Sequence, residues 1–135
     1  MKLAFSLAAA LLATPAVADE FIYFHSPSDN IHCMMMTGEF SAVRCDMLEL
    51  TQSFPKRPVD CDLDWGDAFE VGPNDRQGHV VCHGDTVINP DSMELGYGAS
   101  AQLGEFRCTS EKTGVTCQNA NGHGFSIAKA RQKLF

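Results

Sequence analysis

Two glycines enclose a histidine near the end of the chain, at Gly122, His123 and Gly124. Glycine lets a backbone approach a partner closely, and histidine changes its charge near neutral pH. These three residues are therefore a candidate ligand-contacting loop. The alternative is a tight turn that leads into a strand at Phe125, because glycine is also a common turn residue.

A second candidate group is His32, Met34 and Met36, which alternate around Cys33. If Cys33 points into the core from a strand, these three side chains share the opposite face. One imidazole and two thioethers are suitable ligands for Cu(I). The alternative is that the methionines fill irregular apolar gaps under a loop. The main interpretation assigns no metal and no other cofactor.

Two further patterns lack part of the chemistry that they suggest. His79 and His83 would share a strand face, but nothing indicates a third zinc ligand. The three alternating aspartates from Asp60 to Asp64 begin like a calcium loop, yet Trp65 and Val71 stand where that loop needs glycine and glutamate. We therefore assign no catalytic residue.

The chain has an even number of cysteines, which in an exported protein indicates a disulfide framework. Neither a zinc ribbon nor a thioredoxin-type site is expected, because no two cysteines have the C-x-x-C spacing. The cysteines are Cys33, Cys45, Cys61, Cys82, Cys108 and Cys117.

Two of the disulfide pairs follow from turns in the sequence. A hairpin centred between residues 112 and 113 places Cys108 opposite Cys117, within bridging distance. A turn at residue 39, next to a glycine, places Cys33 opposite Cys45 in the same way. Both bridges therefore close neighbouring β arms.

The clearest strand pattern runs from Val59 to Trp65, where apolar residues alternate with aspartates. Cys61 lies inside this pattern and is left as the partner of Cys82 by elimination. Turn geometry does not support that pair, because the turn centred near residue 75 would set Cys82 opposite Ala68.

Five more short strands are separated by Gly, Pro and Asn clusters, and two short helices are possible. This spacing predicts an all-β fold, a small disulfide-stapled sandwich or barrel with at most one or two short helices. A weak repeat of valine before cysteine leaves a threefold, trefoil-like arrangement as the alternative. The strands are Ala68–Val71, His79–His83, Glu105–Cys108, Val115–Gln118 and Phe125–Ile127, and the helices are Asp46–Gln52 and Ser126–Leu134.

The first 18 residues are typical of an export signal, with Lys2, an apolar run and a small-x-small site that ends at Ala18. The mature chain, residues 19–135, then forms one disulfide-stapled β domain in the periplasm or outside the cell. The apolar run is about half of the ~20 residues that span a bilayer, so we expect no transmembrane segment after cleavage.

The charge balance limits the class of partner. The chain has 10 Lys and Arg against 17 Asp and Glu, and loss of Lys2 with the signal leaves a net charge of −8. We therefore expect no nucleic-acid partner, because a sequence-independent binder must neutralise phosphates with basic side chains.

Several motifs resemble a family of small exported six-cysteine bacterial proteins that is catalogued as a domain of unknown function. The resemblance covers nearly the whole mature chain and implies export, six cysteines and one domain, but no activity. Asp29 stands where the family commonly has glycine. The matching motifs lie at Phe24–Cys33, Val43–Asp46, Cys61–Gly66, Cys82–Thr86, Tyr97–Gly98, Phe106–Cys108, Gly114–Asn119 and Gly122–Phe125.

These observations together predict an exported, non-catalytic binding module, monomeric or weakly associating, that holds a protein or an envelope component by its loops and one sheet face. An inhibitor of a secreted hydrolase such as lysozyme is one version, because the acidic mature chain would attract a cationic enzyme. The alternatives are a periplasmic copper-binding protein and a small hydrolase.

Overall fold

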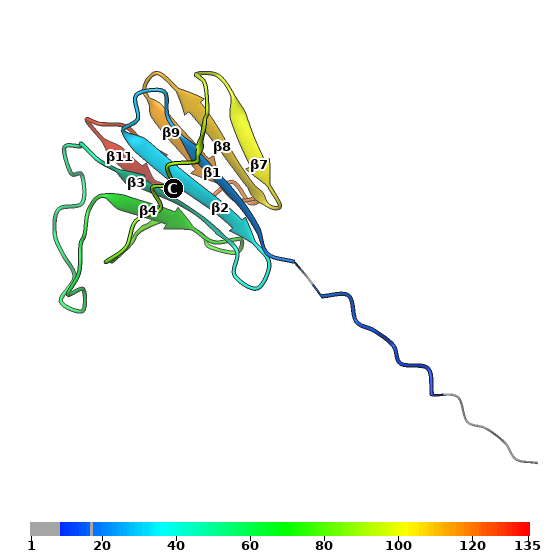
Figure 1. The fold of residues 1–135 in the computed structure, drawn as a ribbon. Helices are drawn as coiled ribbons and strands as arrows, with labels where there is room; N and C mark the ends of the chain where they lie inside the picture. Colours follow the sequence, from blue (N-terminus) through cyan, green and yellow to red (C-terminus); the bar gives the residue numbers. More distant parts are fainter. Residues whose placement is uncertain (1–8, 17) are drawn as a thin grey trace, which may run out of the picture.

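The computed structural model describes residues 9–16 and 18–135. Residues 9–16 and 18 form neither strand nor helix and lead away from the sheets (Figure 1). The predicted signal peptide falls partly outside the described residues, at 1–8 and 17, so its cleavage remains a prediction. The described part of the chain contains no α-helix, and hence none that could cross a bilayer.

The strands form two sheets. The six-stranded sheet has the order β5-β4-β3-β2-β1-β6, and the five-stranded sheet has the order β11-β10-β9-β8-β7. All pairings are antiparallel except that of β1 with β6. The strands are β1 Glu20–His25, β2 Ile31–Thr37, β3 Ala42–Met47, β4 Ala68–Val71, β5 His79–Val80, β6 Met93–Glu94, β7 Ser100–Leu103, β8 Phe106–Glu111, β9 Gly114–Gln118, β10 Gly124–Ile127 and β11 Gln132–Leu134.

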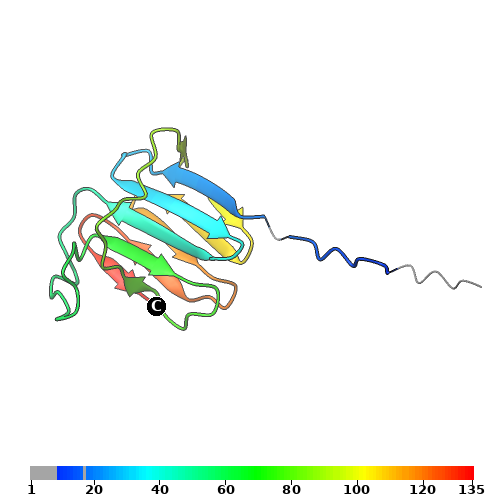
Figure 2. The same cartoon turned by 60° about the horizontal axis from the view of Figure 1, so that its bottom comes forward.

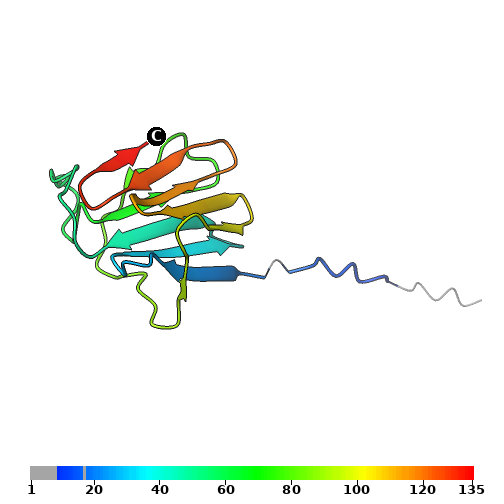
Figure 3. The ribbon, with the colours of Figure 1, turned by 90° about the horizontal axis from the view of Figure 1, so that it is seen from above.

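The two sheets stack face to face and enclose one apolar core (Figures 1 and 3). Successive strand residues point to opposite faces, so every second side chain of each sheet enters this core. Phe69 of β4 packs on Phe125 of β10, with ring centroids 6.3 Å apart. The predicted all-β sandwich is therefore confirmed. The sheets do not close into a barrel, and their two-layer arrangement replaces the threefold alternative.

All six cysteines are paired as predicted. The two pairs derived from turns lie directly opposite each other in their hairpins. The pair left by elimination is also present, across a sequence separation of 21 residues. The bridges are Cys33–Cys45, Cys61–Cys82 and Cys108–Cys117.

The predicted strand from Val59 to Trp65 is wrong. Only Asp64 of this segment forms a ladder contact, a single bridge to His83. Val59 and Leu63, which the alternation assigned to a core, are exposed. The segment is a surface connection between β3 and β4. Alternation alone did not make it a strand, because a strand also needs a neighbour to pair with along its length.

Both predicted helices are also wrong. The segment Asp46–Gln52 starts with the end of β3, and Ser126–Leu134 is a hairpin of β10 and β11. Ala128 and Arg131 close that hairpin through reciprocal backbone hydrogen bonds. Residues 48–52 leave the sheet as an irregular connection, whereas alternate side chains of β10 and β11 face the core. The strand predicted at His79–His83 is shorter than expected and ends at Val80.

Residues 81–92 connect β5 to β6, which lie at opposite edges of the six-stranded sheet. This crossover therefore passes over the outer face of that sheet (Figure 1). The amide of Val87 donates to Asp46 Oδ2 at 3.1 Å as it crosses β3. The outer side chains of the five-stranded sheet, in contrast, remain exposed or half-buried.

Candidate functional site

A groove of about 480 Å³ lies beside the β5 edge of one sheet and the β11 edge of the other. An apolar hollow with a few polar groups at its rim is the usual form of a binding site, so this groove is the candidate site. Its apolar lining is Phe54, Pro55, Trp65, Val80 and Leu134, and its polar lining is Ser53, Lys56, Gln77, Gly78 and His79.

Gly78 joins the two sheets at the groove. Its amide lies 3.1 Å from the carbonyl oxygens of both Gly124 and Phe135. A Cβ atom at position 78 would stand 2.2 Å from the carbonyl oxygen of Gly124, so only glycine permits this approach. Figure 2 shows the C-terminal strand alongside the edge of the six-stranded sheet.

Gln132 fixes one wall of the groove. It is buried, with 2% exposure, and its amide nitrogen donates to the carbonyls of Ala128 at 2.8 Å and Thr51 at 3.2 Å. Its Oε1 accepts a hydrogen bond from the backbone amide of Ser53, and the backbone amide of Gln132 donates to Ser53 Oγ. These bonds hold the loop after β3 against β11, which brings Phe54 to the groove.

Trp65, the only tryptophan of the chain, forms another wall. Its Nε1 donates to the carbonyl of Phe54 at 3.0 Å, while part of the ring stays exposed. The adjacent residue, Asp64, exchanges two backbone hydrogen bonds with His83. The Cys61–Cys82 bridge closes the same connection, so the third disulfide positions Trp65.

Carboxylates surround the histidine at the groove rim. His79 Nε2 lies 3.5 Å from Glu70 Oε1, and its Nδ1 lies 3.7 Å from Asp75 Oδ2. The hydrogen bond with Glu70 raises the pKa of His79, although partial burial acts in the opposite direction. At alkaline pH, His79 loses its proton and the groove rim becomes more negatively charged.

All residues that line the groove except Leu134 come from the acidic segment 19–94, although the lining itself contains Lys56 and no carboxylate. Residues 19–94 contain four Lys and Arg against 15 Asp and Glu, which gives a net charge of −11. The six-stranded sheet and the loop that carries Trp65 are built from these residues. A cationic partner would therefore be attracted to this side.

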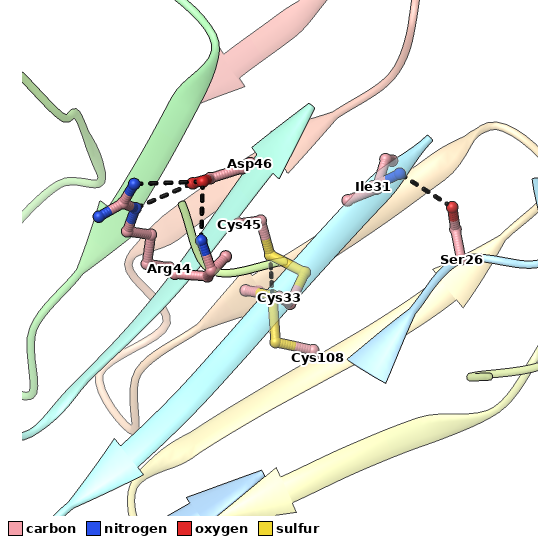
Figure 4. The surroundings of a disulfide bond; sticks show 9 residues. Ser26, Ile31, Cys33, Arg44, Cys45, Asp46 and Cys108 are labelled. Atoms are coloured by element: carbon pink, nitrogen blue, oxygen red, sulfur yellow. Dashed lines mark hydrogen bonds and ion pairs between the residues drawn. A yellow bond between two sulfur atoms is a disulfide. The ribbon is translucent and has the colours of Figure 1, made fainter. Parts of the chain in front are cut away.

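An ionic network centred on the buried Arg44 holds the crossover on the six-stranded sheet. Arg44 Nε lies 2.9 Å from Asp46 Oδ1, and Arg44 Nη1 lies 2.9 Å from Asp85 Oδ1. In Figure 4 both Arg44 and Asp46 point away from the disulfide formed by the intervening Cys45. The guanidinium holds the pKa of Asp85 below its usual value. Sequence reasoning missed this network, because Asp85 is 41 residues from Arg44 in the chain.

His83 extends the network and carries a positive charge there. Its Nε2 lies 2.8 Å from Asp67 Oδ1 and its Nδ1 lies 2.6 Å from the carbonyl oxygen of Asp85. Both partners only accept hydrogen bonds, so both ring nitrogens donate. Burial opposes this charge, but the bonds to Asp67 and Asp85 outweigh it and raise the pKa of His83. The expected shared face of His79 and His83 does not form, because β5 ends before His83.

The loop at Gly122, His123 and Gly124 has a clear structural role. Gly122 has a φ of 80°, and a Cβ at Gly124 would stand 1.9 Å from the carbonyl oxygen of Cys117. The side-chain oxygen of Asn119 accepts a hydrogen bond from the amide of His123 at 3.1 Å. The glycines therefore build the turn before β10, and ligand contact by this loop remains a prediction.

His32, Met34 and Met36 lie on the outer face of β2, as expected, opposite residues of β3. His32 Nε2 donates to the carbonyl of Asp29 at 3.0 Å, whereas its buried Nδ1 has no hydrogen-bond partner. In the described residues, the one cluster of three His, Cys, Asp or Glu ligand atoms is formed by cysteines that are already in disulfides.

Comparison with known proteins gives one match. A protein-family model covers residues 4–135, nearly the whole chain, and its description is "Family of unknown function (DUF6636)". No curated protein and no solved structure matches the chain. These comparisons supply no ligand and no reaction.

Proposed function

Because the chain belongs to the Family of unknown function (DUF6636), whose description names no activity, we propose a function from its surfaces: an exported, non-catalytic module that binds a cationic protein. The observation that supports this proposal is the apolar groove at Trp65, which is built mainly from residues 19–94, a segment with a net charge of −11. Three disulfides support export, because such bonds persist in oxidising compartments.

The groove offers an anchor point for an apolar side chain of the partner. Tryptophan is enriched among residues that dominate binding energy, and such residues lie in hollows that exclude water. Trp65 is held by its bond to Phe54, so little of its freedom is lost on binding. The partner would place an aromatic or aliphatic side chain between Trp65 and Leu134.

Carboxylates around the groove would orient this partner. Glu70 and Asp75 lie beside His79 at the rim, and the connection that carries Trp65 also exposes three aspartates between residues 60 and 64. Complementary charge accelerates association and selects among partners. A secreted cationic hydrolase such as lysozyme is the concrete form of this proposal.

Binding to lysozyme tests the proposal directly. We expect a complex at low ionic strength that weakens with salt and reduces lysozyme activity. Val80→Arg places a bulky cation in the groove and should weaken the complex at least tenfold. Thr116→Arg adds the same charge on the opposite sheet and should change the affinity less than twofold. Calorimetry and a cell-wall lysis assay give the two measurements.

A second experiment decides the wider proposal. The wild-type protein and the Val80→Arg variant are immobilised and exposed to envelope extract from the source organism. Retention of a basic protein by the wild type alone, followed by binding of that purified protein, supports the groove. The proposal fails if lysozyme does not bind and the extract yields no basic protein that distinguishes the two columns.

We also propose copper binding as a second candidate, on one observation. His32 donates through Nε2 to a backbone carbonyl and leaves a buried, unpartnered Nδ1, which is how metal-ligating histidines are commonly anchored. The ring of His25 lies 5.8 Å away, and its Nδ1 is paired with Ser92 Oγ. Met34 is half-buried on the same face.

Metal analysis separates this candidate from the first. Protein purified from the periplasm should contain one copper per chain, and both His25→Ala and Met34→Ala should lower that content at least tenfold. His79→Ala, at the groove, is the control and should keep the copper. Copper-free wild-type protein that also fails to take up added Cu(I) removes the candidate.

A further inference from the structure

A row of polar side chains crosses the entire outer face of the five-stranded sheet. Its members lie directly opposite one another on successive strands, from Ser100 through Thr109, Thr116 and Ser126 to Lys133. Ser100 bonds Thr109 and Thr116 bonds Ser126, each through hydroxyl oxygens 2.9 Å apart. The row therefore presents hydroxyl groups from four strands and an ammonium group from the fifth.

Arg107 lies in a parallel row, between Gln102 and Gln118. Its Nη2 donates to Ser100 Oγ at 3.2 Å, and its Nη1 lies 3.5 Å from Gln102 Oε1. These contacts keep the guanidinium along the sheet. The cation therefore lies beside the hydroxyl row and stays exposed.

Two shallow hollows of about 300 and 240 Å³ lie on this face and share Glu111 and Thr116. Arg131 and Lys133 line the larger hollow, and Arg107 lines the smaller one. Each hollow thus combines hydroxyl groups with at least one cation. Glu111 is the one carboxylate in their linings.

The charge of this part of the chain is opposite to that of the rest. Residues 95–135 contain five Lys and Arg against two Asp and Glu, a side-chain charge of +3, whereas residues 19–94 carry −11. The five-stranded sheet is built from residues of the segment 95–135. In the two hollows Arg107, Arg131 and Lys133 outnumber Glu111, so this sheet face attracts anions although the mature chain as a whole is acidic.

We propose that this face binds a linear polyanion, a polymer with recurring carboxylate or phosphate groups. Arg107 on β8 and Lys133 on β11 are three strand spacings apart, about 14 Å across the strands, and two residues apart along them, about 7 Å. Anionic groups at such a spacing contact both cations, and each hydroxyl pair keeps one O–H that can donate to a polymer oxygen. The polymer lies across the strands, and Glu111 repels it from one side. This site is independent of the groove at Trp65.

Titration with three labelled polymers tests the proposal. The probes are polygalacturonate, polyphosphate and neutral dextran of similar length, and binding is followed by fluorescence anisotropy between 20 and 200 mM NaCl. We expect binding of at least one polyanion that weakens as salt rises, since ion release drives such contacts. Dextran should not bind. Preference for one polyanion identifies carboxylate or phosphate as its natural group.

Two charge-matched double variants locate the site. Arg107→Gln with Lys133→Gln should weaken polyanion binding at least tenfold at 50 mM NaCl and make its salt dependence shallower. Arg57→Gln with Arg76→Gln removes the same charge from exposed residues elsewhere and should weaken binding less than twofold. Equal weakening by both variants, tight dextran binding, or no polyanion binding at 20 mM NaCl would overturn the proposal.

Discussion

Cys45 Sγ lies 3.7 Å from Cys117 Sγ, so a disulfide from each sheet meets its counterpart at the centre of the core. Both cysteines are fully buried. Figure 4 shows the Cys33–Cys45 bridge with Cys108 of the other sheet beside it. The covalent bonds run within the sheets, so only packing joins the two layers here. The third disulfide has a different position and, we infer, a different effect.

Removal of the third bridge should affect the groove specifically. We expect Cys61→Ala with Cys82→Ala to lower the free energy of unfolding by about 3 kcal/mol, because the unfolded chain gains freedom. It should also shift Trp65 emission to longer wavelength, since the loop that carries the ring loosens. Cys108→Ala with Cys117→Ala, which opens a hairpin away from Trp65, is the control. Identical emission from the two folded variants would contradict this role.

Protonated His83 should stabilise the fold. Its pKa is raised in the folded protein, so its contribution is complete below its ordinary value near 6.5 and is lost as pH rises through the folded value. The difference in unfolding free energy between wild type and His83→Gln should therefore decrease from pH 6 to pH 9. Urea unfolding at several pH values measures it. His79 titrates in both proteins, so its contribution cancels in the difference between their unfolding free energies. A difference that grows with pH would contradict the assignment.

The two carboxylates that pair with Arg44 should contribute unequally. Asp46 has a side chain with 6% exposure, and that of Asp85 has 79%. We expect Asp46→Ala to cost about 3–5 kcal/mol, because it leaves a buried guanidinium without its main partner. Asp85→Ala should cost about 1 kcal/mol or less, as for exposed ion pairs. Chemical denaturation of both variants tests this order, and equal costs would refute it.

The two glycines around His123 should also differ. Gly124→Ala would place a Cβ 1.9 Å from a backbone oxygen, which cannot be relieved by rotation of a side chain. It should destabilise the protein by more than about 3 kcal/mol, as severe backbone clashes do. At Gly122 there is open space, so alanine meets only the positive φ and should cost about 1 kcal/mol. Thermal unfolding compares them. A Gly124→Ala variant as stable as the wild type would contradict this structural role.

Local signals predicted part of the fold correctly. Two turns next to glycines identified two cysteine pairs, because the register of a hairpin follows from its turn. The strand at Ala68–Val71 has the predicted bounds. The alternation from Val59 to Trp65 led to a wrong strand prediction. Alternation indicates one polar and one apolar face, but it does not show that a neighbouring strand is present to pair with. The residues of β11 were predicted as part of a helix, and β1, β6 and β7 were not predicted.

The candidate site was not predictable in the same way. The groove combines Trp65, Val80 and Leu134, which are separated in sequence and meet only where the two sheets end. Similarly, the pairing of Arg44 with Asp85 depends on a crossover that spans the sheet. Neither arrangement has a spacing that a motif could record.

The sequence by itself determined the disulfide framework and the β character, because turns and alternation act over a few residues. The sequence also contains an acidic and a basic segment, but their charges lie on separate surfaces only because each segment folds into its own sheet. Tertiary structure alone decided which face is covered, where the groove lies and which charges are buried. Those features depend on contacts between distant segments, whose free energy comes from burial in the folded chain and is not written in any local pattern.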